Sequence, residues 1–188
     1  MTTGFAKHFE QHQQVVASSV ATLESRAESA ADAIVTALAA GNKIICFGNG
    51  GSATQASHMA EELVGRYKKT RRPFPAISLS SDSGTVTCIS NDFGYETLFE
   101  RQVEAFVKPG DVAIALTTSG KSENVVRALR SARERGATTI ALTGKAGLSG
   151  ADPDHLLAVP SSDGEFIQEV HLMLLHVWCA AVDRTLGD

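Results

Sequence analysis

The chain has 188 residues, enough for one domain with a sizeable core and too few for two domains of ordinary size. Its composition is that of an ordinary globular protein, 43% hydrophobic and 20% charged, and its net charge of −4 argues against nucleic acid or an anionic membrane as a general partner. Because no apolar run approaches a membrane span and the first residues lack a signal-peptide core, we expect a cytoplasmic protein without a membrane partner.

The predicted elements begin with a long helix. Apolar residues at helical spacing run from about Phe5 to Ala40 and stop at Gly41. Strands and helices alternate after it. We predict strands at Ile44–Phe47, Ala76–Leu79, Val112–Thr117, Thr139–Leu142 and Leu156–Val159, and helices at Ser52–Arg66, about Gly84–Ile89, Glu96–Phe106, Ser122–Arg135 and Glu165–Thr185.

This order of elements predicts an α/β fold. The central strands are nearly continuous apolar runs, which is typical of parallel strands covered on both faces. We therefore predict a three-layer sandwich in a single domain, residues 1–188, with an open parallel five-stranded sheet, helices on both faces and long N- and C-terminal helices. In such sheets ligands bind beyond the carboxyl ends of the strands, so the most polar strand-to-helix turns should line the site.

The first strand-to-helix turn, Gly48-Asn-Gly-Gly-Ser52, predicts an anion site. Its glycines allow the backbone to approach a ligand closely, and Ser52 is the predicted N-cap of a helix whose first N–H groups attract negative charge. The spacing is not that of a dinucleotide fingerprint, because the third glycine would stand at Ala53. A purely structural glycine turn is the alternative for this segment alone.

Two turns into that helix, His58 and Glu62 stand four residues apart and share one helical face. An imidazole beside a carboxylate, close to a phosphate cradle, suggests chemistry on a phosphorylated small molecule. An ordinary surface pair is the alternative. The basic segment that follows, 66–72, is interpreted as a solvated loop or as local steering for an anionic substrate.

The second polar turn, Thr117-Thr-Ser-Gly-Lys-Ser122, offers four hydroxyls directly after an apolar strand. Hydroxyls and free N–H groups at one strand end suit a phosphate, and a single capping serine would explain only one of them. A third polar stretch contains Asn91 and Asp92, which we place between two helices. These two residues could bind sugar hydroxyls or could simply form a turn.

The last predicted helix is apolar nearly all round between Leu172 and Val182, which predicts burial in a core or in an oligomer interface. His176 lies inside this apolar stretch and needs a polar partner there. The three cysteines, Cys46, Cys88 and Cys179, are far apart in apolar contexts, and we interpret them as reduced core thiols.

Taken together, these motifs resemble the phosphoheptose (sedoheptulose-7-phosphate) isomerase family, which has the sugar-isomerase (SIS) fold. The resemblance covers almost the whole chain, and its motifs are 48–52, 58–67, 91–94, 118–122, 142–144 and 167–171 with His176. It implies interconversion of sedoheptulose 7-phosphate and glycero-manno-heptose 7-phosphate, the first step of nucleotide-heptose synthesis. It also implies a homotetramer with sites near subunit contacts, in which residues 1–40 pack in the oligomer.

The same resemblance assigns roles to individual residues. One zinc ion per subunit would be held by His58, Glu62, Gln168 and His176. Glu62 and His176 would also be the acid/base pair. Glu165 stands where an aspartate is expected, which leaves its role open. The substrate shell would contain Asn49, Gly50, Gly51, Ser52, Arg66, Asn91, Asp92, Thr117, Thr118, Ser119, Ser122 and Gln168.

Aldose–ketose isomerisation through an enediol needs a base at the C–H, an acid at the carbonyl oxygen and stabilisation of the developing negative charge. We assign the first role to Glu62 and the oxygen protons to His176. Two alternatives remain at this point: a non-enzymatic SIS-fold protein that binds a protein partner, and an isomerase of another sugar phosphate.

Overall fold

The structure, a computed structural model, describes residues 4–187; the ends of the predicted domain, residues 1–3 and 188, lie outside that range. The strands are β1 (Ile44–Gly48), β2 (Ala76–Ser78), β3 (Val112–Thr117), β4 (Thr138–Thr143) and β5 (His155–Ala158). The helices are α1 (Phe5–Ala39), α2 (Gly51–Val64), α3 (Ser83–Phe93), α4 (Leu98–Phe106), α5 (Glu123–Glu134) and α6 (Gly164–Leu186), with a 3₁₀ turn at Tyr95–Thr97.

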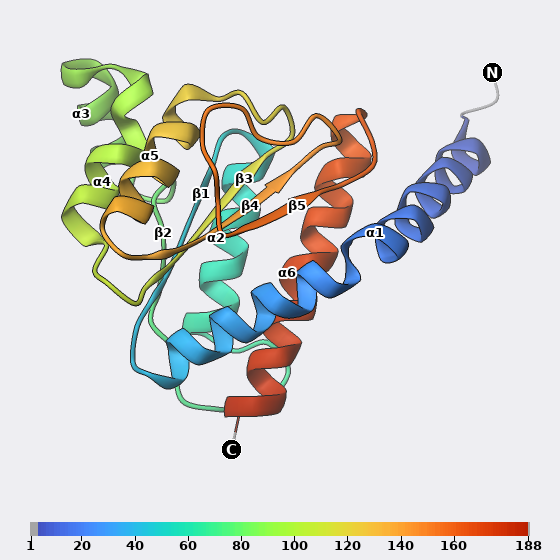
Figure 1. The fold of residues 1–188 in the computed structure, drawn as a ribbon, viewed down its shortest axis with the longest axis horizontal. Helices are drawn as coiled ribbons and strands as arrows, with labels where there is room; N and C mark the ends of the chain where they lie inside the picture. The colour runs from blue at the N-terminus through green and yellow to red at the C-terminus, as the bar shows by residue number, and fades with distance from the viewer. Residues whose placement is uncertain (1–3, 188) are drawn as a thin grey trace.

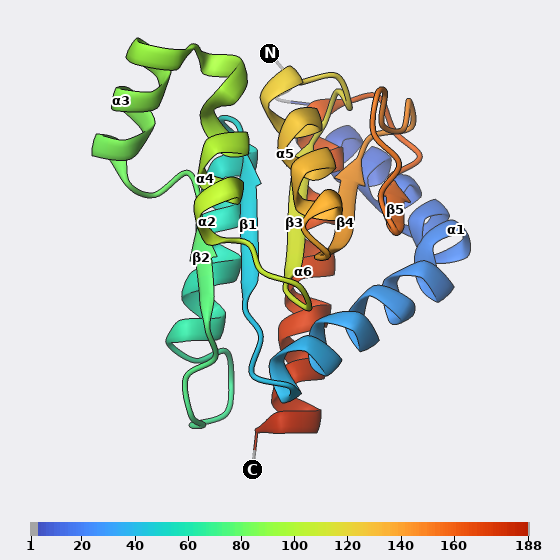
Figure 2. The same ribbon diagram turned by 60° about the vertical axis from the view of Figure 1, so that its left-hand side comes forward.

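The five strands form one parallel sheet in the order β2-β1-β3-β4-β5. Helices α1, α2 and α6 cover one face, and α3, α4 and α5 lie on the other (Figures 1 and 2). Side chains of β1 alternate between the two faces of the sheet: Cys46 packs on the face covered by α1, α2 and α6, and Phe47 packs on the face covered by α3, α4 and α5. The predicted three-layer α/β fold is confirmed.

The long terminal helices pack against each other over the sheet. The indole Nε1 of Trp178, on α6, donates to the carbonyl of Ala27 on α1 at 3.0 Å, and the Trp178 side chain is fully buried. Figure 1 shows the first turns of α1 extending beyond the rest of the molecule. Among the helices of residues 4–187, none is long and apolar enough to cross a membrane.

Two local predictions are wrong. Ser52 is not an N-cap: α2 begins one residue earlier, and its N-cap is Gly50 at φ 56°, a left-handed conformation that glycine adopts without strain. Asn91 and Asp92 do not lie between helices. They belong to the last turn of α3, which Asp82 caps by accepting from the Gly84 N–H and which ends only at Gly94.

The cysteine interpretation is partly wrong. All three thiols are free, and Cys46 and Cys179 are buried, but Cys88 is exposed on α3. The apolar neighbours of Cys88 in sequence suggested a core position. The structure instead buries only Ile89 of this helix, because α3 contacts the core along a narrow stripe.

Candidate active site

The two polar strand-to-helix turns lie side by side at one edge of the sheet. Strands β1 and β3 are paired neighbours, with Gly48 in register with Leu116. A Cβ on Gly48 would stand 2.6 Å from the Leu116 carbonyl oxygen, so only glycine permits this approach. The turns predicted to bind phosphate therefore meet, as the carboxyl ends of adjacent parallel strands must.

Asn49 joins these turns through a paired amide contact. Its Nδ2 donates to Oδ1 of Asn124 at 2.9 Å, and its Oδ1 accepts from Nδ2 of Asn124 at 3.0 Å. The Tyr95 hydroxyl also donates to Oδ1 of Asn49, at 2.7 Å. Asn124, which is buried, and Tyr95 were not predicted as site residues, because nothing in their local sequence marks them as partners of Asn49.

The hydroxyls of the second turn are only partly used within the protein. Thr117 accepts from the Gly120 N–H at 3.2 Å, and Ser119 accepts from the Lys121 N–H at 3.3 Å. Ser122 occupies the N-cap position of α5, yet its side chain makes no capping hydrogen bond. Its hydroxyl and the first N–H groups of α5 are therefore available to an anion beside Thr118 and Ser119.

Other predicted substrate residues lie apart from this pair of turns in sequence and are more open. Asn91 and Asp92 are exposed, and the Asn91 amide donates to the Asp92 carboxylate at 2.7 Å. Arg66 is exposed just beyond α2, and Glu165 is exposed in the first turn of α6. The roles of Asn91, Asp92 and Arg66 in substrate binding stay predictions, and the role of Glu165 stays open.

Gln168 lies against the first turn of α2. A Cβ added to Gly51 would meet the Gln168 amide at 2.6 Å, and the Gln55 side chain donates to the Gln168 carbonyl oxygen at 2.6 Å. The absence of a side chain at Gly51 thus makes room for the Gln168 amide beside the predicted anion site.

The deciding geometry is that of His58, Glu62 and His176. Nε2 of His58 lies 3.1 Å from Nε2 of His176 and 3.4 Å from the Glu62 carboxylate. One ligand atom from each of the three side chains lies within 4.8 Å of the other two. The ring of Tyr67 stacks on His176 with centroids 5.7 Å apart. Helices α2 and α6 therefore bring the predicted acid/base pair together with a second imidazole.

These three side chains fit a divalent metal ion. Two ligands bound tetrahedrally to zinc at about 2.1 Å stand roughly 3.4 Å apart, close to the distances from Nε2 of His58 to the Glu62 carboxylate and to Nε2 of His176. Nδ1 of His58 lies 3.3 Å from the Glu61 carboxylate, a partner that orients the ring and leaves Nε2 free to bind the ion. This role of Glu61 was not predicted from the sequence. Nitrogen and oxygen donors suit zinc as well as other first-row metals, so the donor set alone does not select one.

His171 forms part of the core instead. It is fully buried on α6, and its Nε2 lies 3.2 Å from the Thr143 carbonyl oxygen, to which it donates. Burial lowers the pKa of His171 to about 4 although the bond to Thr143 opposes that change, so the ring is neutral near pH 7.

The chain is similar to known proteins over most of its length. Residues 7–144 match the SIS domain family. The phosphoheptose isomerase of Aquifex aeolicus (strain VF5) is 51% identical over 183 residues, which are 97% of this chain and 96% of the relative. The chain belongs to the phosphoheptose isomerase family. The resemblance predicted from the motifs is thereby confirmed.

Other phosphoheptose isomerases match over the same extent. That of Aliarcobacter butzleri is 44% identical over 188 residues, covering all of both chains. The solved phosphoheptose isomerase of Francisella tularensis aligns with a TM-score of 0.93 at 33% identity, over 98% of this chain and all of the other. That of Neisseria gonorrhoeae aligns with a TM-score of 0.88 at 34% identity, over 96% and 97% of the two chains.

Proposed function

We propose that this protein converts D-sedoheptulose 7-phosphate to D-glycero-D-manno-heptose 7-phosphate, the first step of nucleotide-heptose synthesis. The observation that carries the proposal is the contact of His58, Glu62 and His176 in a chain of the phosphoheptose isomerase family. The adjoining polar turns support a phosphorylated substrate, because hydroxyls and helix N-termini at one sheet edge suit a phosphate.

In the proposed mechanism the Glu62 carboxylate takes the proton from the carbon that bears the hydroxyl beside the carbonyl. The electron pair of that C–H bond becomes the second bond of the enediol, and His176 delivers a proton to the carbonyl oxygen. His176 then removes the proton of the other hydroxyl while Glu62 returns its proton to the neighbouring carbon. The reaction moves one proton between adjacent carbons and needs no external oxidant.

Each of the other site residues has a proposed task. The hydroxyls of Thr117, Thr118, Ser119 and Ser122 bind the phosphate. The end of the sugar next to the phosphate is positioned by Asn49, Gly50, Gly51, Ser52 and Gln168. The sugar hydroxyls are bound by Arg66, Asn91 and Asp92. Zinc, one per subunit, is the proposed cofactor, held by His58, Glu62, Gln168 and His176. When bound, the ion supplies Lewis-acid polarisation of a substrate oxygen.

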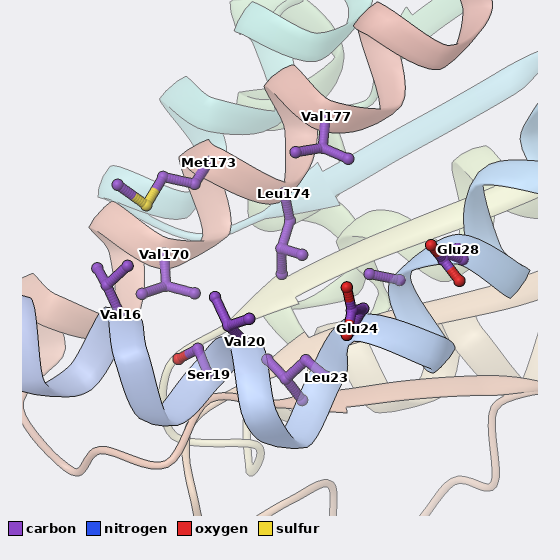
Figure 3. Close-up of a pocket in the computed structure, with 11 residues that line it drawn as sticks. Val16, Ser19, Val20, Leu23, Glu24, Glu28, Val170, Met173, Leu174 and Val177 are labelled. Carbon is purple, nitrogen blue, oxygen red and sulfur yellow. The ribbon is translucent and has the colours of Figure 1, made fainter.

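We also propose a cytoplasmic homotetramer, built on one SIS domain, in which residues 1–40 pack against other subunits near the sites. An apolar groove of about 380 Å³ between α1 and α6 supports an assembly (Figure 3). Val20 and Val177 on its walls are 58% and 56% exposed, and Met173 beside them is 44% exposed. Apolar side chains this exposed on adjoining helices are typical of an interface.

Turnover on a panel of five- to seven-carbon ketose phosphates tests the function, with metal analysis of the purified protein beside it. We expect the seven-carbon substrate to give the highest kcat/KM. We expect metal analysis to find one zinc ion per subunit, and the His58→Gln variant should lose this ion. A higher kcat/KM for a shorter sugar phosphate would reassign the substrate. No turnover on any of them, with a folded protein, would favour a partner-binding protein instead.

A further inference from the structure

The basic segment after α2, residues 66–72, was interpreted as a solvated loop. That interpretation is wrong at Arg71, whose side chain is fully buried. Its Nη2 donates to the Glu62 carbonyl oxygen and its Nη1 to the Leu63 carbonyl oxygen, both at 2.9 Å. These carbonyls lie in the last turn of α2, where no further helical N–H can reach them. Arg71 therefore caps the end of α2 at the residue proposed as the base.

Asp183, which is buried on α6, receives three donors from the same segment. Its Oδ2 accepts from the backbone N–H groups of Lys68 and Lys69, both at 2.9 Å, and its Oδ1 accepts from Nε of Arg71 at 2.8 Å. Burial by itself would raise the pKa of Asp183, but these hydrogen bonds and the Arg71 charge hold it below its ordinary value. The side chain is therefore an anion that ties segment 66–72 to α6.

This contact joins the two helices that carry the proposed catalytic residues. Arg71 bonds to the backbone of Glu62 on α2, and Asp183 follows His176 by seven residues, about two turns of α6. Tyr67, in the tied segment, stacks on the His176 ring at an interplanar angle of 24°. The Arg71–Asp183 pair thus fixes the end of α2 relative to α6, and it holds the segment that places the Tyr67 ring against His176.

We propose that Arg71 and Asp183 are positioning residues that set the separation of Glu62, His58 and His176, and so the metal affinity and turnover of the site. The inference rests on the proposed function of that site. A buried ion pair commonly contributes no more stability than well-packed apolar residues, so its distinctive effect here is geometric. Neither residue touches the proposed substrate shell through any contact found among residues 4–187, so neither is assigned a chemical step.

Asp111 offers a matched control elsewhere in the fold. It is buried like Asp183, and it also accepts two backbone N–H groups, those of Lys43 and Lys108, and one side-chain cation, that of Lys43. Its partners precede β1 and β3 and do not belong to α2 or α6. Asp183→Asn and Asp111→Asn therefore remove the same charge from similar buried sites, and only the first should disturb the active site.

The experiment measures the Co²⁺ affinity, kcat and KM of both variants against wild type, with thermal unfolding to verify the fold. We expect Asp183→Asn to lose about 10- to 100-fold in Co²⁺ affinity, as removal of outer-shell support does. Its kcat should fall about 10-fold or more while KM stays within about twofold. Asp111→Asn should leave all three values unchanged. Equal losses in both variants, or wild-type values for folded Asp183→Asn, would overturn the proposal.

Two further measurements keep the test decisive. Arg71→Lys retains the cation opposite Asp183 but lacks the planar five-donor fork that reaches Asp183 and both α2 carbonyls together, so it should show the same losses if Asp183→Asn does not fold. If wild type neither binds Co²⁺ nor turns over, the proposed function fails, and NMR of the His176 ring protons still tests the positioning. Their ring-current shift from Tyr67 should disappear in Asp183→Asn and persist in Asp111→Asn; its persistence in both would overturn the inference.

Discussion

Nε2 of His58 and Nε2 of His176 face each other at 3.1 Å, with the Glu62 carboxylate 3.4 Å from the first of them. Two nitrogens this close cannot both carry a proton without strong repulsion, so they share a proton or bind one cation. The side chain of Glu62 is 15% exposed and that of His58 is 36% exposed. The site is thus open enough for a substrate and enclosed enough to strengthen its electrostatic interactions.

Glu62→Gln should lower kcat by at least about 100-fold, the lower end of the range for a general acid–base group. The amide keeps the size of the side chain and one oxygen but cannot accept the carbon-bound proton. Exchange of solvent deuterium into the substrate should fall together with turnover. Near-wild-type kcat in a correctly assembled variant would remove Glu62 as the base.

His176→Gln should also lower kcat by about 100-fold or more, because the enediol oxygens lose their proton donor. The amide can still bond to His58, so the fold and assembly should persist. Comparison of exchange and isomerisation separates the two roles. Deuterium exchange in this variant should exceed its isomerisation, and an equal loss of both would contradict the division of labour with Glu62.

Ser119→Ala and Ser122→Ala should raise KM more than they lower kcat, because each hydroxyl is expected to bind phosphate in both the ground and the transition state. The effect should amount to about 1.5–3 kcal/mol for each lost bond to a charged group. Steady-state kinetics with inorganic phosphate as competing ligand provides the measurement. Unchanged KM in both variants would place the phosphate elsewhere. The control is Ser162→Ala, because Ser162 is an exposed serine that precedes α6.

Val20→Asp and Val177→Asp should split the assembly, since each places a charge on a wall of the apolar groove between α1 and α6. Light scattering at assay concentrations measures the mass. Val64→Asp is a control of matched residue type, because Val64 is 49% exposed but lies outside this groove. An active monomer of the unmutated protein would contradict the proposed tetramer.

Stability should fall as the pH drops from 6.5 toward 4, in part because of His171. Its pKa is about 4 in the folded protein against 6.5 for the ordinary side chain, so the unfolded chain binds the additional proton within that window. The free energy of unfolding should decrease by up to about 1.4 kcal/mol per pH unit from this group. Urea titrations at pH 7 and pH 4.5 should show a smaller decrease for His171→Gln. Equal decreases would exclude His171 as the source.

Local patterns in the sequence were sufficient for the fold class and for part of the site. Apolar runs predicted the positions of the five strands, and the apolar run is continuous in β1, β3 and β4 because these strands are buried on both faces. The spacing of His58 and Glu62 predicted a shared helical face, because residues four apart are about one helical turn apart. The errors at Ser52 and at Asn91 concern element ends, because α2 begins after its N-cap Gly50 and α3 continues until its C-cap Gly94.

Only the tertiary structure decided which distant groups meet. His176 reaches His58 across 118 positions because α2 and α6 pack on the same face of the sheet, and no local pattern encodes that contact. The same holds for Arg71, a basic residue in a polar segment that becomes buried because Asp183 lies opposite it. Residue spacing determines geometry within one element, whereas distances between elements depend on how their side chains pack, and packing is a property of the whole core.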